Sequence, residues 1–250
     1  MKPFKFYYES PQDVPSPYHF EATLVFEFLE TQEVAVQAEI QYVDREDFSK
    51  EDLIAEGLMP DNQWDWKGVL PAVWKPILEK QLKNYKQGEA SPKAYEPFVG
   101  LELSNGEFMK PLAKLEQEDF FIQELLQAVF ELAEREMPLD LGFQFKDENG
   151  QWMLVEGELS FSQRIFRYIV NGEQSTIRTA DFDAIKSLMN DLYIGEFVSE
   201  KSEEKLKNSN CFAVFPGDGF WYVAGNSWKK PNGNQQYFAN LEDQLTNLFS

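Results

Sequence analysis

The sequence predicts an α+β fold in which antiparallel β-meanders and hairpins pack against helices on one face. Three observations support this prediction. Apolar residues alternate with polar ones in several segments, they recur at helical spacing in others, and glycine- and asparagine-rich turns separate the strands of the second half. Hydrophobic residues make up 43% of the 250 positions, 22 of them phenylalanine, so the chain can bury a core and is not of the disordered class.

The first predicted element is a β-hairpin formed by residues 20–28 and 34–42. Apolar side chains occupy every second position of both segments, which is typical of half-buried strands. A turn at 30–32 places Phe26 opposite Val36 and puts both apolar sets on one face. A slip of one residue would separate the sets, so the register is well determined. The alternating residues are Phe20, Ala22, Leu24, Phe26 and Phe28, followed by Val34, Val36, Ala38, Ile40 and Tyr42.

Helical spacing and capping residues predict the helices. They are expected at residues 50–56, 72–87, 119–136, 181–194 and 241–249. Ser49 and Asn240 are suitable caps for the first and last of these. Pro138 ends the third and Gly195 ends the fourth.

The second half of the chain predicts an antiparallel meander around three turns. These turns lie at residues 148–150, 171–172 and 216–219. The first turn places Phe143 opposite Val155. The second, Asn171-Gly172, is typical of a type I′ hairpin turn. The third folds residues 212–215 back onto 220–223.

A domain boundary is predicted near residues 111–117, giving an N-terminal α+β half, 1–115, and a C-terminal α+β half, 116–250. Each half contains a Phe-x-Phe strand, a return strand and then a helix, so the two halves are candidates for a divergent duplication. A single domain of this size is the alternative.

Charge limits the classes of partner. The chain has 43 acidic and 23 basic residues and a net charge of −20. This sign disfavours nucleic acid and anionic membrane surfaces, and it favours a basic protein partner. Solubility alone is the simpler explanation of the charge. No apolar run reaches the roughly 20 residues that span a bilayer, and a single cysteine excludes an intrachain disulfide, so we expect a cytoplasmic protein.

The supply of catalytic and metal-binding side chains is small. His19 and Cys211 are the only histidine and cysteine. They cannot provide a multi-histidine or thiolate metal site, so no metal and no cofactor are expected. We expect His19 at an edge or surface and Cys211 as an inert, half-buried thiol. There is no Gly-x-Ser-x-Gly motif of a serine hydrolase.

Glu156 and Glu158 form the first candidate site. They lie two positions apart on a predicted strand, so their side chains leave the same face. Two carboxylates in this arrangement are able to bind a cation or to act as an acid and a base. A solvated sheet face is the alternative.

Two tryptophan-rich segments form the second kind of candidate site. One contains Trp64 and Trp66. The other contains Trp221 and continues through Trp228 to the basic pair Lys229 and Lys230. Tryptophan on a loop favours recognition because it joins a large apolar area to a polar group. Tryptophans that fill the core are the alternative.

These observations favour a non-enzymatic interaction protein that neutralises a basic protein partner. One alternative is a carboxylate-based hydrolase built around Glu156 and Glu158. Another is a small-ligand binder with a tryptophan-lined pocket. We expect no catalytic residue, no nucleic-acid partner and no membrane partner.

Overall fold

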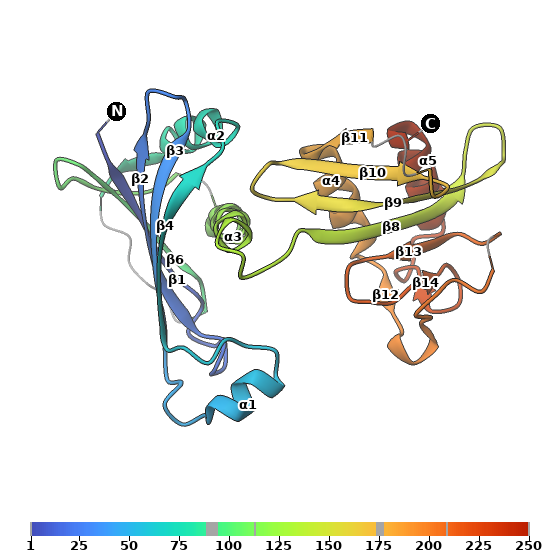
Figure 1. Ribbon diagram of the computed structural model, residues 1–250, viewed down its shortest axis with the longest axis horizontal. Coiled ribbons are helices and arrows are strands. Elements are labelled where there is room, and N and C mark those ends of the chain that lie inside the picture. Colours follow the sequence, from blue (N-terminus) through green and yellow to red (C-terminus); the bar gives the residue numbers. More distant parts are fainter. Residues whose placement is uncertain (1, 89–94, 113, 174–177, 209, 250) are drawn as a thin grey trace. The chain divides into compact units, whose positions relative to one another are not determined.

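The computed structural model describes residues 2–88, 95–112, 114–173, 178–208 and 210–249. The chain folds as two compact units, Met1–Glu136 and Met137–Ser250 (Figure 1). Each unit is an antiparallel sheet with helices on one face, which confirms the predicted α+β class. The units divide at 136–137 instead of 115–116, because helix α3 (Leu115–Leu132) packs on the sheet of the first unit.

The first unit contains a seven-stranded sheet in the order β4-β3-β2-β1-β6-β7-β5. Its strands are β1 (Phe4–Glu9), β2 (Phe20–Phe28), β3 (Val34–Tyr42), β4 (Gln63–Leu70), β5 (Tyr85–Gln87), β6 (Phe98–Leu103) and β7 (Phe108–Pro111). Its helices are α1 (Lys50–Ala55), α2 (Trp74–Leu82) and α3. Figure 1 shows α2 and α3 on the same side of the sheet. We call the side that α3 covers the inner face.

The predicted register of the first hairpin is confirmed. Phe26 lies opposite Val36, and Leu24 lies opposite Ala38. Phe26 and Leu24 are fully buried on the inner face. The ring of Phe6 on β1 meets Phe121 of α3 at a centroid distance of 6.1 Å. This face is therefore the core of the first unit.

A carboxylate is buried in this core. Glu118 of α3 is 1% exposed and accepts hydrogen bonds from the Tyr85 hydroxyl at 2.7 Å and from Gln81 Nε2 at 2.5 Å. Burial raises the pKa of Glu118, and the two hydrogen bonds oppose that change. The Glu118 carboxylate therefore links helix α3 to helix α2 and strand β5.

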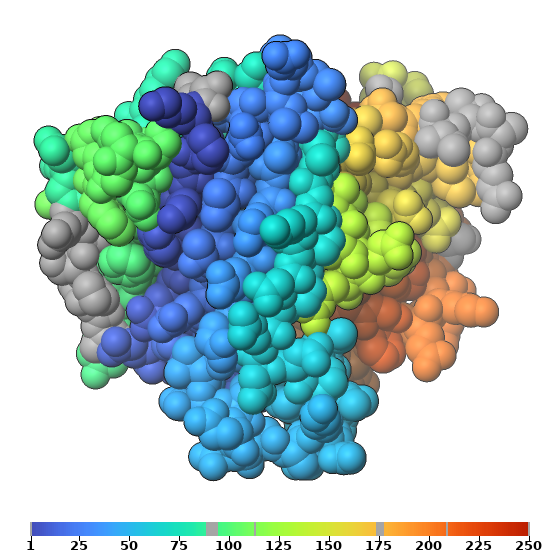
Figure 2. All heavy atoms as spheres, turned by 60° about the vertical axis from the view of Figure 1, so that its left-hand side comes forward, coloured from blue at the N-terminus to red at the C-terminus, as the bar shows by residue number. Residues whose placement is uncertain are grey.

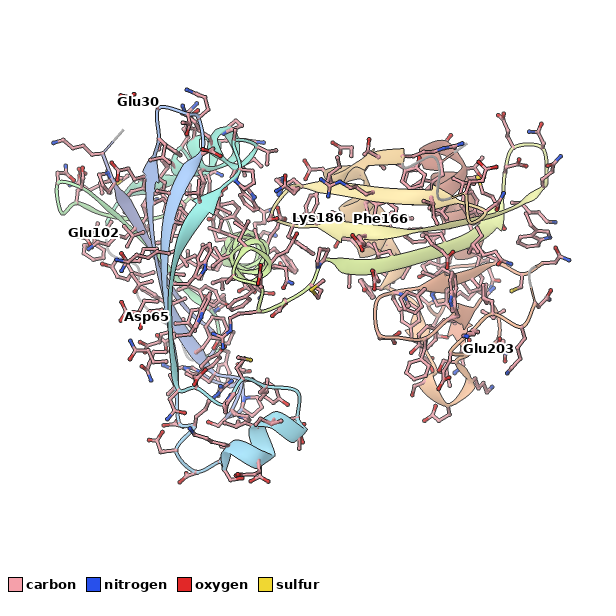
Figure 3. The ribbon with its side chains drawn as sticks, viewed as in Figure 1. Glu30, Asp65, Glu102, Phe166, Lys186 and Glu203 are labelled. Carbon is pink, nitrogen blue, oxygen red and sulfur yellow. The ribbon has the colours of Figure 1, made fainter. Side chains whose placement is uncertain are left out.

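The second unit contains a six-stranded sheet in the order β11-β10-β9-β8-β13-β14. Its strands are β8 (Leu139–Lys146), β9 (Trp152–Ser160), β10 (Ile165–Val170), β11 (Arg178–Asp181), β13 (Ala213–Phe215) and β14 (Tyr222–Val223). A separate pair joins β12 (Glu196–Phe197) to β15 (Trp228–Lys229), and a short 3-10 helix covers Ser199–Lys201. Helices α4 (Phe182–Leu192) and α5 (Tyr237–Phe249) cover the inner face of the sheet, toward which Phe166 points (Figure 3).

The predicted pairing of the second sheet is also confirmed. Phe143 lies opposite Val155, as expected from a turn at 148–150. Asn171 and Gly172 both have positive φ, 51° and 75°, as a type I′ turn requires. Residues 213–214 pair with 222–223 around the third predicted turn.

Several element boundaries differ from the predictions. The helix expected at 72–87 ends at Leu82, because Tyr85 turns into the core and begins β5. The last helix begins at Tyr237 instead of 241, so Asn240 lies inside it. Tyr237 packs against Trp228, and its hydroxyl donates to the Leu192 carbonyl, which extends the helix toward the core.

The two sheets share one strand order. If the strands of each unit are numbered from its first strand, both sheets read 4-3-2-1-6-7, and β5 adds an edge strand in the first unit. One helix follows the fourth strand and another ends each unit. The two units are therefore similar in topology, although the Phe-x-Phe strands that the sequence analysis matched, β2 and β8, are the second and first strands of their units. None of the helices in the described ranges is long and apolar enough to cross a membrane.

Candidate functional site

The outer face of the second sheet, opposite its helices, carries a hollow of about 330 Å³ that we call the second trough. Its floor consists of backbone around Gly142 on β8 and Gly157 on β9. Acidic and aromatic side chains form its walls. They are Asp140, Glu156, Glu158, Phe215 and Trp221.

Glycine at position 142 allows Trp221 to form one wall. A Cβ atom at Gly142 would lie 2.5 Å from Trp221 Cη2, so the indole ring lies directly over the glycine. The Trp221 backbone exchanges two hydrogen bonds, of 2.7 and 3.0 Å, with Glu203. Its ring packs 5.6 Å from Phe215. The aromatic wall is therefore held in place by the backbone on one side and by a second ring on the other.

The carboxylates of the second trough come from two adjacent strands. Asp140 lies directly opposite Glu158, and Glu156 lies opposite Gly142. All three side chains are exposed. Like charges directly opposite each other destabilise a sheet unless a cation screens them. Arg167, opposite Glu158 on the other neighbouring strand, supplies one positive charge against the three negative ones.

The first sheet carries a similar hollow on its outer face, of about 300 Å³, that we call the first trough. Its walls include Glu9 of β1, Glu21 of β2, Phe98 of β6 and Phe108 of β7. Glu9 lies directly opposite Glu21 on one side and Phe98 on the other. Figure 2 shows this face, with the green of β6 and β7 beside the dark blue of β1 and the blue of β2.

Tyr7 closes one side of the first trough. Its ring stacks on Phe108 at 5.9 Å, and its hydroxyl donates to Glu102 Oε2 at 2.5 Å. Glu102 lies on the side of the sheet away from α3 (Figure 3). The hydrogen bond from Tyr7 lowers the pKa of Glu102, helped by Lys5, whose Nζ lies 3.5 Å from the carboxylate. Glu102 is therefore already engaged within the sheet.

His19 lies beside the first trough. It is 9% exposed, with Nδ1 3.2 Å from the Pro11 carbonyl and Nε2 3.7 Å from Glu9 Oε1. The sequence predicted an edge or surface histidine, and the side chain is instead buried at the start of β2. Protonated His19 is a counter-ion for Glu9.

The two troughs use corresponding strands and the same kinds of side chain. Each lies on the outer face of strands 1, 2 and 6 of its unit, with a directly opposed pair of carboxylates and with aromatic side chains from or near strands 6 and 7. They lie toward opposite ends of these strands: Glu9 ends β1, whereas Asp140 is near the start of β8. The two troughs therefore share residue types and corresponding strands, but their residues do not occupy matching positions along those strands.

The troughs combine exposed carboxylates with aromatic rings. Within the described residues, no three His, Cys, Asp or Glu side chains converge as metal ligands. A carboxyl group that acts as an acid catalyst near neutral pH needs a desolvated site. Glu156 and Glu158 are both exposed. Carboxylates beside aromatic rings attract Lys and Arg side chains through charge and cation–π contacts.

The structure places Trp228 away from any surface site. Its side chain is fully buried, stacked on Phe197 at a centroid distance of 5.9 Å and edge-to-face with Phe238 at 5.0 Å. Trp228 therefore fills the core of the second unit. It is not the exposed loop anchor that the sequence analysis favours. Lys229 and Lys230 are exposed, and each is engaged locally, with Glu196 at 2.7 Å and Gln235 at 2.5 Å respectively.

Trp64 and Trp66 lie on strand β4 instead of a loop. Both are half-buried on the inner face, because they pair with Ile40 and Ala38 of that face. Their rings stack at a centroid distance of 6.4 Å. Trp64 also packs 5.3 Å from Phe130 of α3.

Sequence reasoning named Glu156, Glu158 and the segment of Trp221 but not Asp140, Phe98 or Phe108. The position of Asp140 follows from the predicted pairing of Phe143 with Val155, because the same register puts Asp140 opposite Glu158. No local signal identifies the phenylalanines, since β6 and β7 were not predicted as strands. Comparison of the chain with protein-family models, curated proteins and solved structures finds no match.

Proposed function

We propose that this protein is a binding module that recognises Lys and Arg side chains of a basic protein segment through the two troughs. The observation that supports this function most strongly is the recurrence of opposed carboxylates beside aromatic side chains on corresponding strands of both units. The net charge of −20 adds a long-range attraction for a basic partner.

Each trough suits one cationic side chain. The aliphatic stem of Lys or Arg packs against the aromatic wall, and its charged end meets the carboxylates. In the second trough the stem lies along Trp221 and Phe215, and the cation meets Glu156, Glu158 and Asp140.

The test uses a short unstructured peptide of Lys, Arg and Gly, titrated into the full chain by calorimetry. The trough variant combines Asp140→Asn, Glu156→Gln and Glu158→Gln. A matched control removes the same charge from exposed positions of the same unit. Its substitutions are Glu148→Gln, Glu200→Gln and Glu204→Gln.

We expect the trough variant to bind roughly ten- to a hundredfold more weakly, because each exposed ion pair contributes up to about 1 kcal/mol. The control variant should lose much less affinity for the peptide, because its substitutions change only the long-range electrostatic attraction. Equal losses in the two variants would show that the peptide responds to net charge alone and would refute the trough assignment. Replacing Glu9 and Glu21 by Gln in the first trough provides the same test for the first unit.

A further inference from the structure

The first unit contains a second pocket whose chemistry is opposite to that of the troughs. It has a volume of about 250 Å³ and lies at one end of the inner face, between strands β2 and β3, the turn at 57–59 and the end of α3. Aromatic rings and two arginines line it. They are Tyr18, Phe20, Tyr42, Phe130, Arg45 and Arg135. We call it the arginine pocket.

Arg45 brings a buried positive charge to this pocket. The residue is 2% exposed, and its guanidinium carbon lies 3.4 Å from the centre of the Tyr42 ring. Nε donates to the Pro17 carbonyl at 2.8 Å, and Nη1 donates to the carbonyls of Met59 at 2.9 Å and Asp61 at 3.1 Å. These partners are carbonyl dipoles. No carboxylate in the described part of the chain forms an ion pair with Arg45.

Arg135 brings a second positive charge to the pocket, and one of its guanidinium nitrogens has no hydrogen-bond acceptor among the described residues. Its side chain is 10% exposed, and its guanidinium carbon lies 4.6 Å from the centre of the Trp64 ring. Its Nη1 is buried and has no hydrogen-bond partner among the described residues. Nη2 lies 3.8 Å from Asp61 Oδ2, beyond hydrogen-bond distance, and Asp61 is largely exposed. A buried cationic donor without an acceptor is costly, so an acceptor in the pocket would stabilise it.

We propose that the arginine pocket binds a small, singly charged carboxylate that carries an aromatic or branched apolar body. The carboxylate meets the open Nη1 of Arg135 and the positive field of Arg45, because planar guanidinium groups match carboxylates. The apolar body lies among Phe20, Tyr42 and Phe130. Glu136 also lines the pocket and Asp61 lies beside it, so a doubly charged phosphate meets more repulsion there than a carboxylate does.

The test compares phenylacetate with its neutral amide, phenylacetamide, and with inorganic phosphate. Binding to the full chain is measured by calorimetry and by the NMR shift of the Trp64 indole N–H, since Arg135 stacks on that ring. We expect saturable binding of one phenylacetate, with the amide at least about tenfold weaker because it loses the charge-assisted contact. Equal binding of acid and amide, tighter binding of phosphate, or no shift of Trp64 would overturn the proposal.

Three variants locate the site. Arg135→Gln should weaken phenylacetate binding at least about tenfold, since the acceptor loses its charged donor. Arg178→Gln, at an exposed arginine of the second unit, is the matched control and should bind as the parent does. Leu58→Trp fills the pocket without removing a charge and should abolish binding. Phenylacetate binding that survives both Arg135→Gln and Leu58→Trp would place the ligand elsewhere.

Discussion

The two units share a strand order, and an inserted segment in the first unit contributes to a pocket on its inner face. Each has an acidic and aromatic trough on the outer face of corresponding strands. Within the described ranges, a helix, α1, between the third and fourth strands is found in the first unit, and this insertion supplies Arg45 and residues 57–59 of the arginine pocket. The shared topology thus provides the trough, and the inserted segment provides the pocket of opposite charge.

The largest predicted effect tests whether the units have separate cores. Phe26→Ala removes a fully buried ring from the inner face of the first sheet. We expect the free energy of unfolding of the first unit to fall by about 3–5 kcal/mol through lost burial and a cavity. Hydrogen exchange should accelerate in β1–β4 while the amides of β8–β10 keep their protection. An unchanged denaturation midpoint would show that Phe26 does not contribute to the core.

The aromatic walls of the two troughs provide the next comparison. Phe108 is 44% exposed, whereas Trp221 is 8% exposed. Phe108→Ala should therefore cost less than about 1 kcal/mol of stability, and Trp221→Ala should cost more because the ring packs over Gly142.

The same two variants separate binding from stability. Both substitutions should weaken the basic peptide measured by calorimetry, since each removes an aromatic wall that contacts a cationic side chain. If Phe108→Ala leaves peptide affinity unchanged, the first trough is not a binding site and the proposal is reduced to the second unit.

A smaller effect concerns the buried carboxylate of the first unit. Burial raises the folded-state pKa of Glu118 above its ordinary value near 4.5. The folded state therefore holds its proton more tightly than the unfolded state does. The associated stability is fully present below about pH 4.5 and is lost as the pH rises through the folded-state pKa.

Glu118→Gln removes this titration and keeps an acceptor for Tyr85. The difference in unfolding free energy between parent and variant should favour the parent at pH 4 and shift toward the variant as the pH approaches 7. Urea titrations at several pH values measure it. If the parent instead gains stability relative to Glu118→Gln as the pH rises, the hydrogen bonds to the Glu118 carboxylate have a larger effect on its pKa than burial does.

The smallest effect is expected at Lys229, an exposed lysine of the second unit. Lys229 pairs with Glu196 at 2.7 Å on the surface, and exposed pairs contribute about 1 kcal/mol or less. Lys229→Ala should therefore change stability by less than that amount and leave peptide binding intact. A loss of peptide affinity in this variant would restore the segment 228–230 as a recognition site.

Local patterns predicted much of the fold because strand register depends on alternation and on turn residues. The pairing of Phe26 with Val36 and the Asn171-Gly172 turn are of this kind. Trp64 and Trp66 were assigned to a loop, although Trp64, Trp66 and Leu70 alternate as an edge strand does. The Trp-Asp-Trp spacing is itself a strand pattern, because alternate residues of a strand face the same side.

The sites were harder to predict than the strands. The opposition of Asp140 to Glu158 follows from register, but the position of Trp221 over Gly142 depends on tertiary packing. Trp228 lies among asparagine, glycine and proline, as an exposed loop residue would, yet its ring is fully buried against Phe197. Composition does not reveal that burial, because α5 and β12 converge on Trp228 from other parts of the unit.

The most direct test of two oppositely charged sites is one NMR experiment with two ligands. Indole N–H signals of Trp221 and Trp64 report on the second trough and the arginine pocket respectively. The basic peptide should shift Trp221 and leave Trp64 unmoved, and added salt should reverse the shift. Phenylacetate should shift Trp64 and leave Trp221 unmoved. If the basic peptide binds without moving Trp221, or if both ligands move the same indole, the assignment of a cation site and an anion site is contradicted.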